Sequence, residues 1–472
     1  MTTDYEGAEI RDEYDVVVLG SGEGGKYLAW TMARLGKRVL VIERKYIGGS
    51  CPNIACLPSK NIIHSAKVAS YFFRSEEFGI SKDNVRISME AVRARKRRMV
   101  DGLVQMHVDN YNGSGAQLLM GSARFIGPKT LEVTLPDGQV RIVRGEKVAI
   151  GTGTRATLPQ IEGLAEARPL THIEALELDH IPEHLIVLGG GYVGLELGQT
   201  MRRFGSRVTV IDRNGSIAHR EDEDVCRALE ELFGDEGIDL RLHTHVQAVE
   251  GLSGERVRLR LKSAEAEDSL EATDLLVAMG RTPNTTGIGL ELADVELTRG
   301  GFIKVDEHLR TTAPDVWAIG DCAGSPLFTH ISFDDFRVVR EDMLGRSRVT
   351  TGRQVPFCMF TDPELARIGL SESEAKAGGI PYRLAKVPMA AALRTRTLSE
   401  TRGFMKALVD TESDRILGFT AFGVSAGEIM GAVQMAMIGG LPYTAVRDAV
   451  LTHPTLLEGL IPLFSAVPAR KG

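Results

Sequence analysis

The sequence predicts an α/β fold in which two Rossmann-like nucleotide-binding domains are followed by a smaller C-terminal α+β domain. Two observations predict the Rossmann-like part. A strand, a glycine-rich turn, a helix, a second strand and an acidic residue follow one another near the N-terminus, and the same order recurs in the middle of the chain. A third observation predicts the last domain: from about Val355, short strand-like pieces alternate with helices, and no nucleotide motif occurs.

Length and charge limit the possible classes of protein. The chain has 472 residues, enough for two to four domains, and a formal net charge of −7 spread along its length. This charge gives no support to a surface for nucleic acid or for an anionic membrane. The basic run Arg93–Arg98 is interpreted as the solvated face of a long helix, and no apolar run reaches transmembrane length.

The N-terminus and the cysteines indicate a cytoplasmic protein. The first fifteen residues are acidic and lack the apolar core of a signal peptide. Five cysteines in a chain of this length do not form a disulfide framework. We therefore expect a reducing compartment, in which a disulfide is more often catalytic than structural.

The first nucleotide fingerprint begins with the β-branched run Tyr14–Gly20, which is apolar on both faces like a buried parallel strand. Gly20, Gly22 and Gly25 provide the tight turn and let a pyrophosphate approach the N-terminus of the next helix. The second strand ends at Glu43, a carboxylate that can accept hydrogen bonds from a ribose. Together these features predict a bound dinucleotide.

The stretch Gly48–Lys60 follows directly and contains Cys51 and Cys56. A disulfide needs Cα atoms roughly 4.4–6.8 Å apart, whereas five residues along a regular helix separate them by about 8–9 Å. We expect Pro52 to open a helix, Cys51 to lie just outside it, and Cys56 to lie in its first turns, where a thiolate is favoured. The alternative is two unrelated thiols near a turn, but the neighbouring fingerprint favours a redox-active pair.

Helices and strands then alternate up to the middle of the chain. Helical sequence covers residues 61–74 and 88–111. Val108–Gln139 is interpreted as strands and turns, and Lys147–Gly153 as a strand that leads to a crossing point between domains.

The second fingerprint repeats the first. The strand His184–Leu188 precedes Gly189, Gly191 and Gly194, and a further strand, Arg207–Ile211, leads to Asp212. The interval from the first glycine to the acid is 23 residues in both copies, 20 to 43 and 189 to 212. Such a repeat predicts two nucleotide-binding units. Two nucleotides and one cysteine pair in a single chain imply that electrons pass between them.

The last third of the chain contributes further strands and helices. Strands are expected over Val246–Leu261 and Leu275–Ala278, the second leading to Gly280, and a buried strand over Asp315–Asp321 ends in a carboxylate. The C-terminal segment is expected to contain these strands and helices, in chain order: Ser371–Ala377, Lys406–Val409, Ile416–Phe422 and Gly427–Ile438.

Four motifs give the sequence a close resemblance to a known family. They are the paired fingerprints, Gly48–Lys60, Ala318–Gly324 (AIGDCAG) and His453–Glu458 (HPTLLE). The chain resembles the FAD-dependent pyridine nucleotide–disulfide oxidoreductases, which include dihydrolipoamide dehydrogenase, glutathione reductase and mercuric reductase. The resemblance covers residues 14–465. It implies an FAD-binding domain (1–155 and 284–350), an NAD(P)-binding domain (156–283) and a dimerisation domain (351–472).

The resemblance assigns the two nucleotides to the two fingerprints. It implies that Asp321 binds the ribityl chain of FAD. Tyr192 stands where some members cover the empty nicotinamide site with a tyrosine, although simple packing is an equal alternative. Glu196 matches a glutamate that pairs with Lys60 beside the flavin. The implied cofactor-binding residues are Gly20, Gly22, Gly25, Glu43, Lys60 and Asp321 for FAD, and Gly189, Gly191, Tyr192, Gly194, Asp212, Arg213 and Gly280 for NAD(P)H.

The resemblance also implies the catalytic roles. Cys56 would be the thiolate next to the flavin, and Cys51 the interchange thiol that meets the substrate. His453 matches an acid–base histidine oriented by Glu458. In this family the histidine reaches the cysteines of the other subunit, so a homodimer is expected. No residues are expected to hold a resident metal ion.

Two departures and one similarity point to one branch of the family. The C-terminal tail lacks the cysteine pair that most mercuric reductases carry, and Ala55 replaces the glycine usual in dihydrolipoamide dehydrogenases. Phe328–Arg337 is most similar to the mercuric-reductase-like group, which includes a copper(II) reductase of reactive-chlorine resistance.

The choice between the two nicotinamide cofactors depends on a few residues. Asp212 favours NADH because its charge repels a 2′-phosphate, whereas Arg213 and Arg220 lie where NADPH users place arginines. We expect NADH to be preferred.

The sequence therefore predicts an FAD-dependent NAD(P)H oxidoreductase. Electrons would pass from NAD(P)H to FAD, to the Cys51–Cys56 pair, and on to mercury(II), copper(II) or an oxidised thiol. The alternatives are a dihydrolipoamide dehydrogenase and a flavoprotein redox sensor with little turnover.

Overall fold

The computed structural model describes residues 12–264 and 266–470, which divide into two compact units. Of the described residues, unit 1 contains 12–61, 90–157 and 280–353, and unit 2 contains 62–89, 158–279 and 354–470. Both units combine sheets with helices, so the predicted α/β class is confirmed. The division into three domains stays a prediction.

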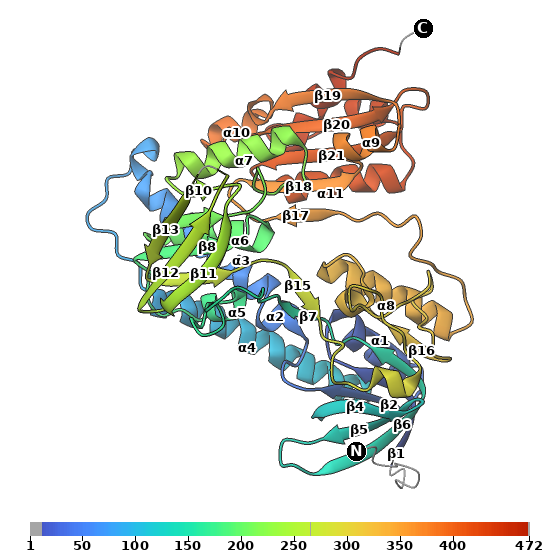
Figure 1. Ribbon diagram of the computed structural model, residues 1–472. Coiled ribbons are helices and arrows are strands. Elements are labelled where there is room, and N and C mark those ends of the chain that lie inside the picture. Colours follow the sequence, from blue (N-terminus) through green and yellow to red (C-terminus); the bar gives the residue numbers. More distant parts are fainter. Residues whose placement is uncertain (1–11, 265, 471–472) are drawn as a thin grey trace. The chain divides into compact units, whose positions relative to one another are not determined.

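Unit 1 is built on a seven-stranded sheet with the order β3-β2-β1-β6-β5-β4, and β16 pairs with β6 (Figure 1). Its first strand, β1, pairs in parallel with both β2 and β6. Every residue of β2 is buried, as expected of a central parallel strand. The strands are β1 (Asp12–Leu19), β2 (Val39–Glu43), β3 (Gln117–Met120), β4 (Ser122–Gly127), β5 (Thr130–Thr134), β6 (Val140–Ile150) and β16 (Val316–Ala318).

Helices α1 (Glu23–Arg34) and α8 (Thr329–Met343) pack on one another in unit 1. Gly24 makes this approach possible, because a Cβ there would lie 2.7 Å from the carbonyl oxygen of Ser332 on α8. Helix α4 (Met89–Ser114) extends beyond its expected end, so the prediction that strands and turns begin at Val108 is wrong. The last turn of α4 carries the buried Tyr111, which packs edge-on against Trp30 of α1.

The described residues of unit 2 form a four-stranded parallel sheet, a three-stranded antiparallel sheet with the order β11-β12-β13, and a five-stranded antiparallel sheet (Figure 1). The parallel sheet has the order β10-β9-β8-β14, and its strands β8 (His184–Leu188) and β9 (Arg207–Ile211) have the predicted bounds. The five-stranded antiparallel sheet has the order β17-β18-β21-β20-β19. Helix α11 (Ala426–Ile438) packs on β18 and β21, so the predicted α+β character of this segment is confirmed.

The remaining elements complete the two units. In chain order they are α2 (Ser50–Asn53), α3 (Cys56–Phe73), η1 (Ser75–Phe78), β7 (Thr154–Ala156), α5 (His172–Ala175), α6 (Tyr192–Phe204), α7 (Glu223–Asp235), β10 (Asp239–Arg241), β11 (His245–Leu252), β12 (Arg256–Lys262), β13 (Glu267–Ala272), β14 (Asp274–Val277), β15 (Arg281–Pro283), η2 (Leu290–Ala293), η3 (Gly320–Ala323), β17 (Phe357–Met359), β18 (Glu364–Gly369), α9 (Glu372–Ala377), β19 (Tyr382–Pro388), η4 (Met389–Ala391), α10 (Leu393–Thr397), β20 (Phe404–Asp410), β21 (Ile416–Gly423), α12 (Tyr443–Arg447), η5 (Leu457–Gly459) and α13 (Leu460–Ser465).

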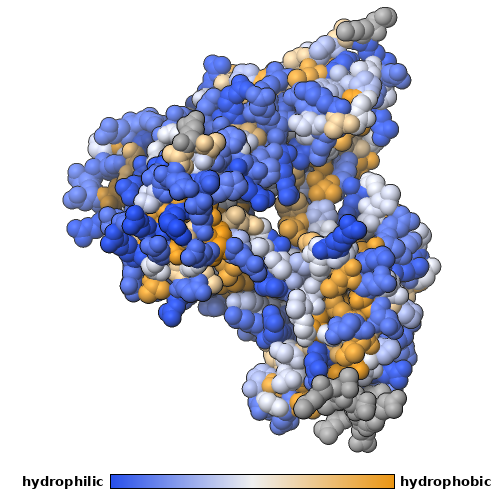
Figure 2. All heavy atoms as spheres, in the orientation of Figure 1, coloured by the Kyte–Doolittle hydropathy of each residue, from blue (hydrophilic) through white to orange (hydrophobic). Residues whose placement is uncertain are grey.

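Hydrophilic side chains cover most of the face shown in Figure 2. Among the described residues, none of the helices combines the length and the apolar character needed to cross a membrane. The basic run on α4 is largely solvated as expected, but Lys96 within it is only 1% exposed.

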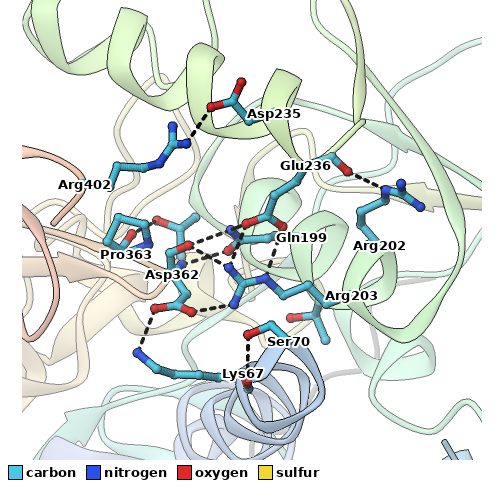
Figure 3. Close-up of polar contacts among 12 residues, drawn as sticks. Lys67, Ser70, Gln199, Arg202, Arg203, Asp235, Glu236, Asp362, Pro363 and Arg402 are labelled. Atoms are coloured by element: carbon cyan, nitrogen blue, oxygen red, sulfur yellow. Dashed lines mark hydrogen bonds and ion pairs between the residues drawn. The ribbon is translucent and has the colours of Figure 1, made fainter. Parts of the chain in front are cut away.

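A network of alternating charges connects three segments of unit 2 (Figure 3). The carboxylate of Asp362 accepts hydrogen bonds from Lys67 of α3, at 2.8 Å, and from Arg203 of α6, at 2.5 Å. Arg203 also binds Glu236, just beyond α7. The main chain of Asp362 exchanges two further hydrogen bonds with the side-chain amide of Gln199 on α6. The lysine and the arginine hold the pKa of Asp362 below its usual value despite burial.

Replacing Asp362 with Asn should destabilise unit 2. The change leaves the charges of Lys67 and Arg203 without their shared carboxylate in a setting where the Asp362 side chain is 12% exposed. We expect a loss of about 3 kcal/mol in the apparent free energy of unfolding, measured in urea. The matched control is Asp235→Asn, because Asp235 pairs with Arg402 but is 64% exposed. The control should cost no more than about 0.5 kcal/mol, and equal losses would contradict a special role for Asp362.

Candidate active site

The first glycine turn holds its acidic residue rigidly. Gly20 has φ +93°, and a Cβ there would lie 2.4 Å from the carbonyl oxygen of Gly151. Glu43, at the end of β2, accepts hydrogen bonds from the amide and hydroxyl of Ser21 at 2.9 and 2.8 Å. Gly22 is the N-cap of α1 and has no side chain to occupy its first amides. The turn therefore offers a helix N-terminus that suits the pyrophosphate of FAD.

The cysteine stretch forms two helices rather than one. Cys51 lies inside the short helix α2, and Cys56 is the first residue of α3. The prediction that Pro52 opens a single helix with Cys51 outside it is therefore wrong. The chain leaves helical geometry at Ile54, where φ is −138°. This break between the helices lets the two cysteines approach, which an undistorted helix would prevent.

Cys51 and Cys56 are hydrogen-bonded to one another. The hydrogen bond to Cys56 and burial raise the pKa of the Cys51 thiol. Cys56 Sγ lies 3.2 Å from the hydroxyl oxygen of Thr329, the first residue of α8. A second proton is therefore lost far less readily than the first, as in any strongly coupled pair. The thiol of Cys51 and the hydroxyl of Thr329 can each donate a hydrogen bond to Cys56 in its thiolate form.

A polar cluster in unit 1 surrounds the predicted ribityl-binding carboxylate. The hydroxyl of Thr154 donates a 2.6 Å hydrogen bond to Asp321. Arg281 donates to the hydroxyl and the carbonyl of Thr154, and its Nε lies 3.9 Å from Asp321. Burial lowers the pKa of Arg281. Sequence analysis missed Thr154, Arg281 and Thr329, although Arg281 directly follows the predicted Gly280.

The second glycine turn has the same construction in unit 2. Gly189 has φ +107°, and a Cβ there would lie 2.5 Å from the carbonyl oxygen of Ala278. The amide of Gly190 donates a 2.7 Å hydrogen bond to Asp212. Asn214 donates to the other oxygen of this carboxylate through its amide and its side chain. Asp212 is thus a fixed, charged acceptor where the ribose of a nicotinamide nucleotide is expected.

The basic residues near this turn are exposed to solvent. Arg213, His219, Arg220 and His243 are all exposed, whereas Asp212 is 9% exposed.

Tyr192, the first residue of α6, is anchored through its hydroxyl. It donates a 2.7 Å hydrogen bond to Glu221, which lies 3.3 Å from Nε of Arg367. Its ring packs on Phe357 at a centroid distance of 5.6 Å. Burial raises the pKa of Tyr192 and of Glu221. These contacts show that Tyr192 packs within unit 2. That its ring covers the nicotinamide site stays a prediction.

Glu196 on α6 is also held within unit 2. Its carboxylate accepts a 2.8 Å hydrogen bond from the amide of Phe360, and the residue is 7% exposed. Lys60 lies one turn after Cys56 on α3 and belongs to unit 1. Because the two residues belong to different units, the pairing of Glu196 with Lys60 stays a prediction.

The structure brings His453 and Glu458 together as expected. Nδ1 of His453 lies 3.0 and 3.1 Å from the two carboxylate oxygens of Glu458. The amide of Thr455 donates to the same carboxylate and, with His453, lowers the pKa of Glu458. The His453 side chain is 67% exposed. This arrangement fixes the proton on Nδ1 and presents Nε2 for proton transfer.

One carboxylate cluster in unit 2 has the spacing of a metal site. Asp222, Asp224 and Glu372 surround the ammonium of Lys406 at 2.7, 2.7 and 3.0 Å. The Lys406 side chain is fully buried, so its charge compensates the three acids. This lysine occupies the position that a cation would need.

Comparisons with known sequences agree with these geometries. The family profile described as pyridine nucleotide-disulphide oxidoreductase matches residues 14–335, and that of its dimerisation domain matches residues 355–462. The chain is 35% identical to the probable pyridine nucleotide-disulfide oxidoreductase RclA of Escherichia coli over 97% of this chain and 100% of the relative.

Two further groups of relatives are nearly as similar. A mercuric reductase of Streptomyces lividans is 33% identical, with coverage of 95% of this chain and 94% of the relative. A mitochondrial dihydrolipoyl dehydrogenase of Dictyostelium discoideum is 31% identical, with coverage of 95% and 93%.

A solved structure shows the same fold. It is described as the Cu(II) complex of the HOCl-induced flavoprotein disulfide reductase RclA from Escherichia coli. It superimposes with a TM-score of 0.88 at 34% sequence identity and covers 97% of this chain and 100% of the other. The two fingerprints, the cysteine pair and the matched profiles lead to one conclusion: the chain belongs to the pyridine nucleotide-disulphide oxidoreductase family.

Proposed function

We propose that the protein carries two electrons from NAD(P)H through FAD to the Cys51–Cys56 pair and on to a thiophilic metal ion or an oxidised thiol. The family is FAD-dependent and uses a pyridine nucleotide. The observation that carries the proposal is the position of Cys56 at the start of α3, hydrogen-bonded to Thr329, with Cys51 coupled to it.

The residues of unit 1 fit bound FAD. The amides around Gly22 would bind its pyrophosphate, Glu43 its adenosine ribose, and Asp321 its ribityl chain. Bound FAD accepts hydride from NAD(P)H and supplies two electrons to a disulfide. The chain contributes Thr154 and Arg281, which keep the Asp321 carboxylate in place.

The dithiol chemistry follows from the coupled thiols. Cys51, as a thiolate, attacks a sulfur of the acceptor, and the other acceptor sulfur leaves and takes a proton. Cys56 then attacks Cys51, which restores their disulfide and releases the reduced acceptor. His453 would move the protons, because Glu458 fixes its Nδ1 and leaves Nε2 for exchange.

A soft metal ion is the acceptor that the relatives favour. The similar RclA structure is a Cu(II) complex, and another relative is a mercuric reductase. Thiolate sulfur is the ligand type that binds such ions. The second candidate is dihydrolipoamide dehydrogenase activity, which the 31% identical relative supports. A redox sensor with little turnover is the third.

We propose a homodimer with an active site shared between subunits. A dimerisation domain is matched over residues 355–462. Within it, Met435 and Ile438 of α11 are 59% and 63% exposed, although apolar side chains of this size are usually buried. A partner subunit would cover them and would receive the exposed His453. The cytoplasm, a reducing compartment, suits a pair that works as a dithiol.

Cys51→Ser should abolish acceptor reduction but leave NADH-dependent reduction of a dye. Serine cannot form the disulfide that receives the electrons, whereas the hydride step to FAD does not need Cys51. NADH oxidation by the FAD-loaded protein should be followed with copper(II), mercury(II), lipoamide and a dye. Equal loss of acceptor and dye reduction would contradict the proposed route. Fast Cys51-dependent turnover of lipoamide alone would favour the second candidate.

His453→Ala should slow dithiol exchange by about a hundredfold or more, the usual contribution of a positioned acid–base group. Reduction of the flavin by NADH, observed by stopped-flow absorbance, should change by less than about twofold, because His453 acts after that step. His180→Ala is a suitable control, since His180 is also exposed and also pairs with a carboxylate, Asp179. A comparable loss of flavin reduction in His453→Ala would rule out the assigned role.

Asp212 should make NADH the better substrate. Its fixed carboxylate can accept from a ribose hydroxyl and repels a 2′-phosphate, so kcat/KM should be higher for NADH. Asp212→Asn should narrow the ratio of the two kcat/KM values by about tenfold. Arg213→Ala should lower kcat/KM for NADPH and leave kcat/KM for NADH unchanged. A higher kcat/KM for NADPH in the unmodified protein would show that the exposed arginines dominate.

A further inference from the structure

A buried lysine in unit 1 belongs to none of the motifs described above. Lys26, in the early part of α1, is only 3% exposed. Its ammonium lies 2.7 Å from the carboxylate of Glu23 and 2.8 Å from Nε2 of His107 on α4. A buried ammonium is costly unless it is paired, so both contacts are needed to keep it there.

His107 holds this lysine as a neutral acceptor. Burial and the charge of Lys26 lower the pKa of His107 to about 4. Its ring stacks on Trp30 of α1 at a centroid distance of 5.9 Å. His107 is therefore uncharged throughout the pH range in which a thiol titrates. It fixes the position of the lysine without competing for the charge of Glu23.

The turn that leads to Cys51 packs directly on this part of α1. A Cβ on Gly49 would lie 2.5 Å from Cα of Gly22, the residue before Glu23. A Cβ on Gly48 would lie 3.0 Å from Nδ1 of His107. The close backbone contact places the turn that leads to Cys51 against the start of α1, the helix that carries Glu23.

We propose that Lys26 is a positioning residue that neutralises Glu23 and so allows Cys51 to act as a nucleophile near neutral pH. The proposal rests on the proposed role of Cys51 as the interchange thiol. It assigns the lysine no contact with the acceptor. Without Lys26, the charge of Glu23 would act on the thiol uncompensated.

The charged groups around the pair agree with this assignment. Cys51 is influenced by Cys56 and Glu23, both of which raise its pKa, and by the hydroxyl of Thr329, which lowers it. Arg281 acts on the pair through Cys56. Around Lys26 the groups are Glu23, His107 and the ring of Tyr27, whose centroid is 5.6 Å away. Glu23 is the one carboxylate among these groups, and Lys26 is its partner.

The test measures ionisation of Cys51 directly. The purified FAD-loaded protein is reduced, and the rate at which iodoacetamide alkylates Cys51 is followed by mass spectrometry from pH 6 to 10. The Cys51 thiolate forms a bond to carbon and iodide leaves, so the rate reports the thiolate fraction. No acceptor takes part in this reaction.

Lys26→Met should move the midpoint of this profile upward by about one pH unit, which is an approximately tenfold slower alkylation below the midpoint. Glu23→Gln should move it in the opposite direction, and the double variant should return it close to the original. Lys147→Met is the matched control, because Lys147 is another lysine of unit 1 but donates to the carbonyl of Met343. Its profile should not change.

An unchanged midpoint in Lys26→Met would overturn the proposal, as would a double variant that stays as slow as Lys26→Met. If Lys26→Met fails to fold, the downward shift in Glu23→Gln decides, and its absence would count against the role of the ion pair. If these profiles do not move but Cys51→Ser still abolishes turnover, only the assignment of Lys26 fails. If they shift as expected and Cys51→Ser still turns over the acceptor, the proposed electron route fails instead.

Discussion

The backbone contact between Gly49 and Gly22 is the constraint on which the candidate site depends. No Cβ fits on Gly49, because it would lie 2.5 Å from Cα of Gly22. The contact sets the cysteine stretch on the N-terminus of α1, where the amides that suit a pyrophosphate begin. The proposed dinucleotide binding and the proposed thiol chemistry would therefore share one stretch of backbone in unit 1. A side chain at Gly49 would push the cysteine stretch away from the start of α1, whereas a Cβ on Gly22 would meet only the carbonyl oxygen of Gly151, at 4.0 Å.

Paired buried charges repeat throughout the molecule, and each pair keeps particular segments together. In unit 2, Asp362 connects α3 with α6, and Lys406 gathers three carboxylates from two segments, Asp222 and Asp224 from one and Glu372 from the other. In unit 1, Lys26 joins α1 to α4 through His107. Removing one partner leaves the other charge buried and unpaired. Substitution at such a site therefore lowers stability by more than the intact ion pair contributes to it. These charge pairs determine which segments of the chain contact one another. Hydrophobic packing alone is less specific in this respect.

The chemistry of the pair depends on the groups beside it that can hold or donate a proton. The hydrogen bond to Cys56 and burial raise the pKa of the Cys51 thiol, and Thr329 places a neutral hydroxyl 3.2 Å from Cys56 Sγ. Proton transfer to and from the dithiol thus needs a group from elsewhere. His453, exposed and oriented by Glu458, has the required form. In the proposed homodimer, the base and the thiols would come from different subunits.

The sequence by itself determined the two fingerprints, the cysteine pair and the His453–Glu458 motif, because each consists of residues close together in the chain with a local geometric requirement. The sequence therefore predicted the first and last residues of β8 and β9 correctly. Only the tertiary structure decided the break at Ile54, the anchoring of Tyr192 by Glu221, and the contact of Lys26 with His107. These depend on long-range packing: Lys26 and His107 are 81 residues apart, and no local pattern of hydrophobicity or glycine spacing brings them together.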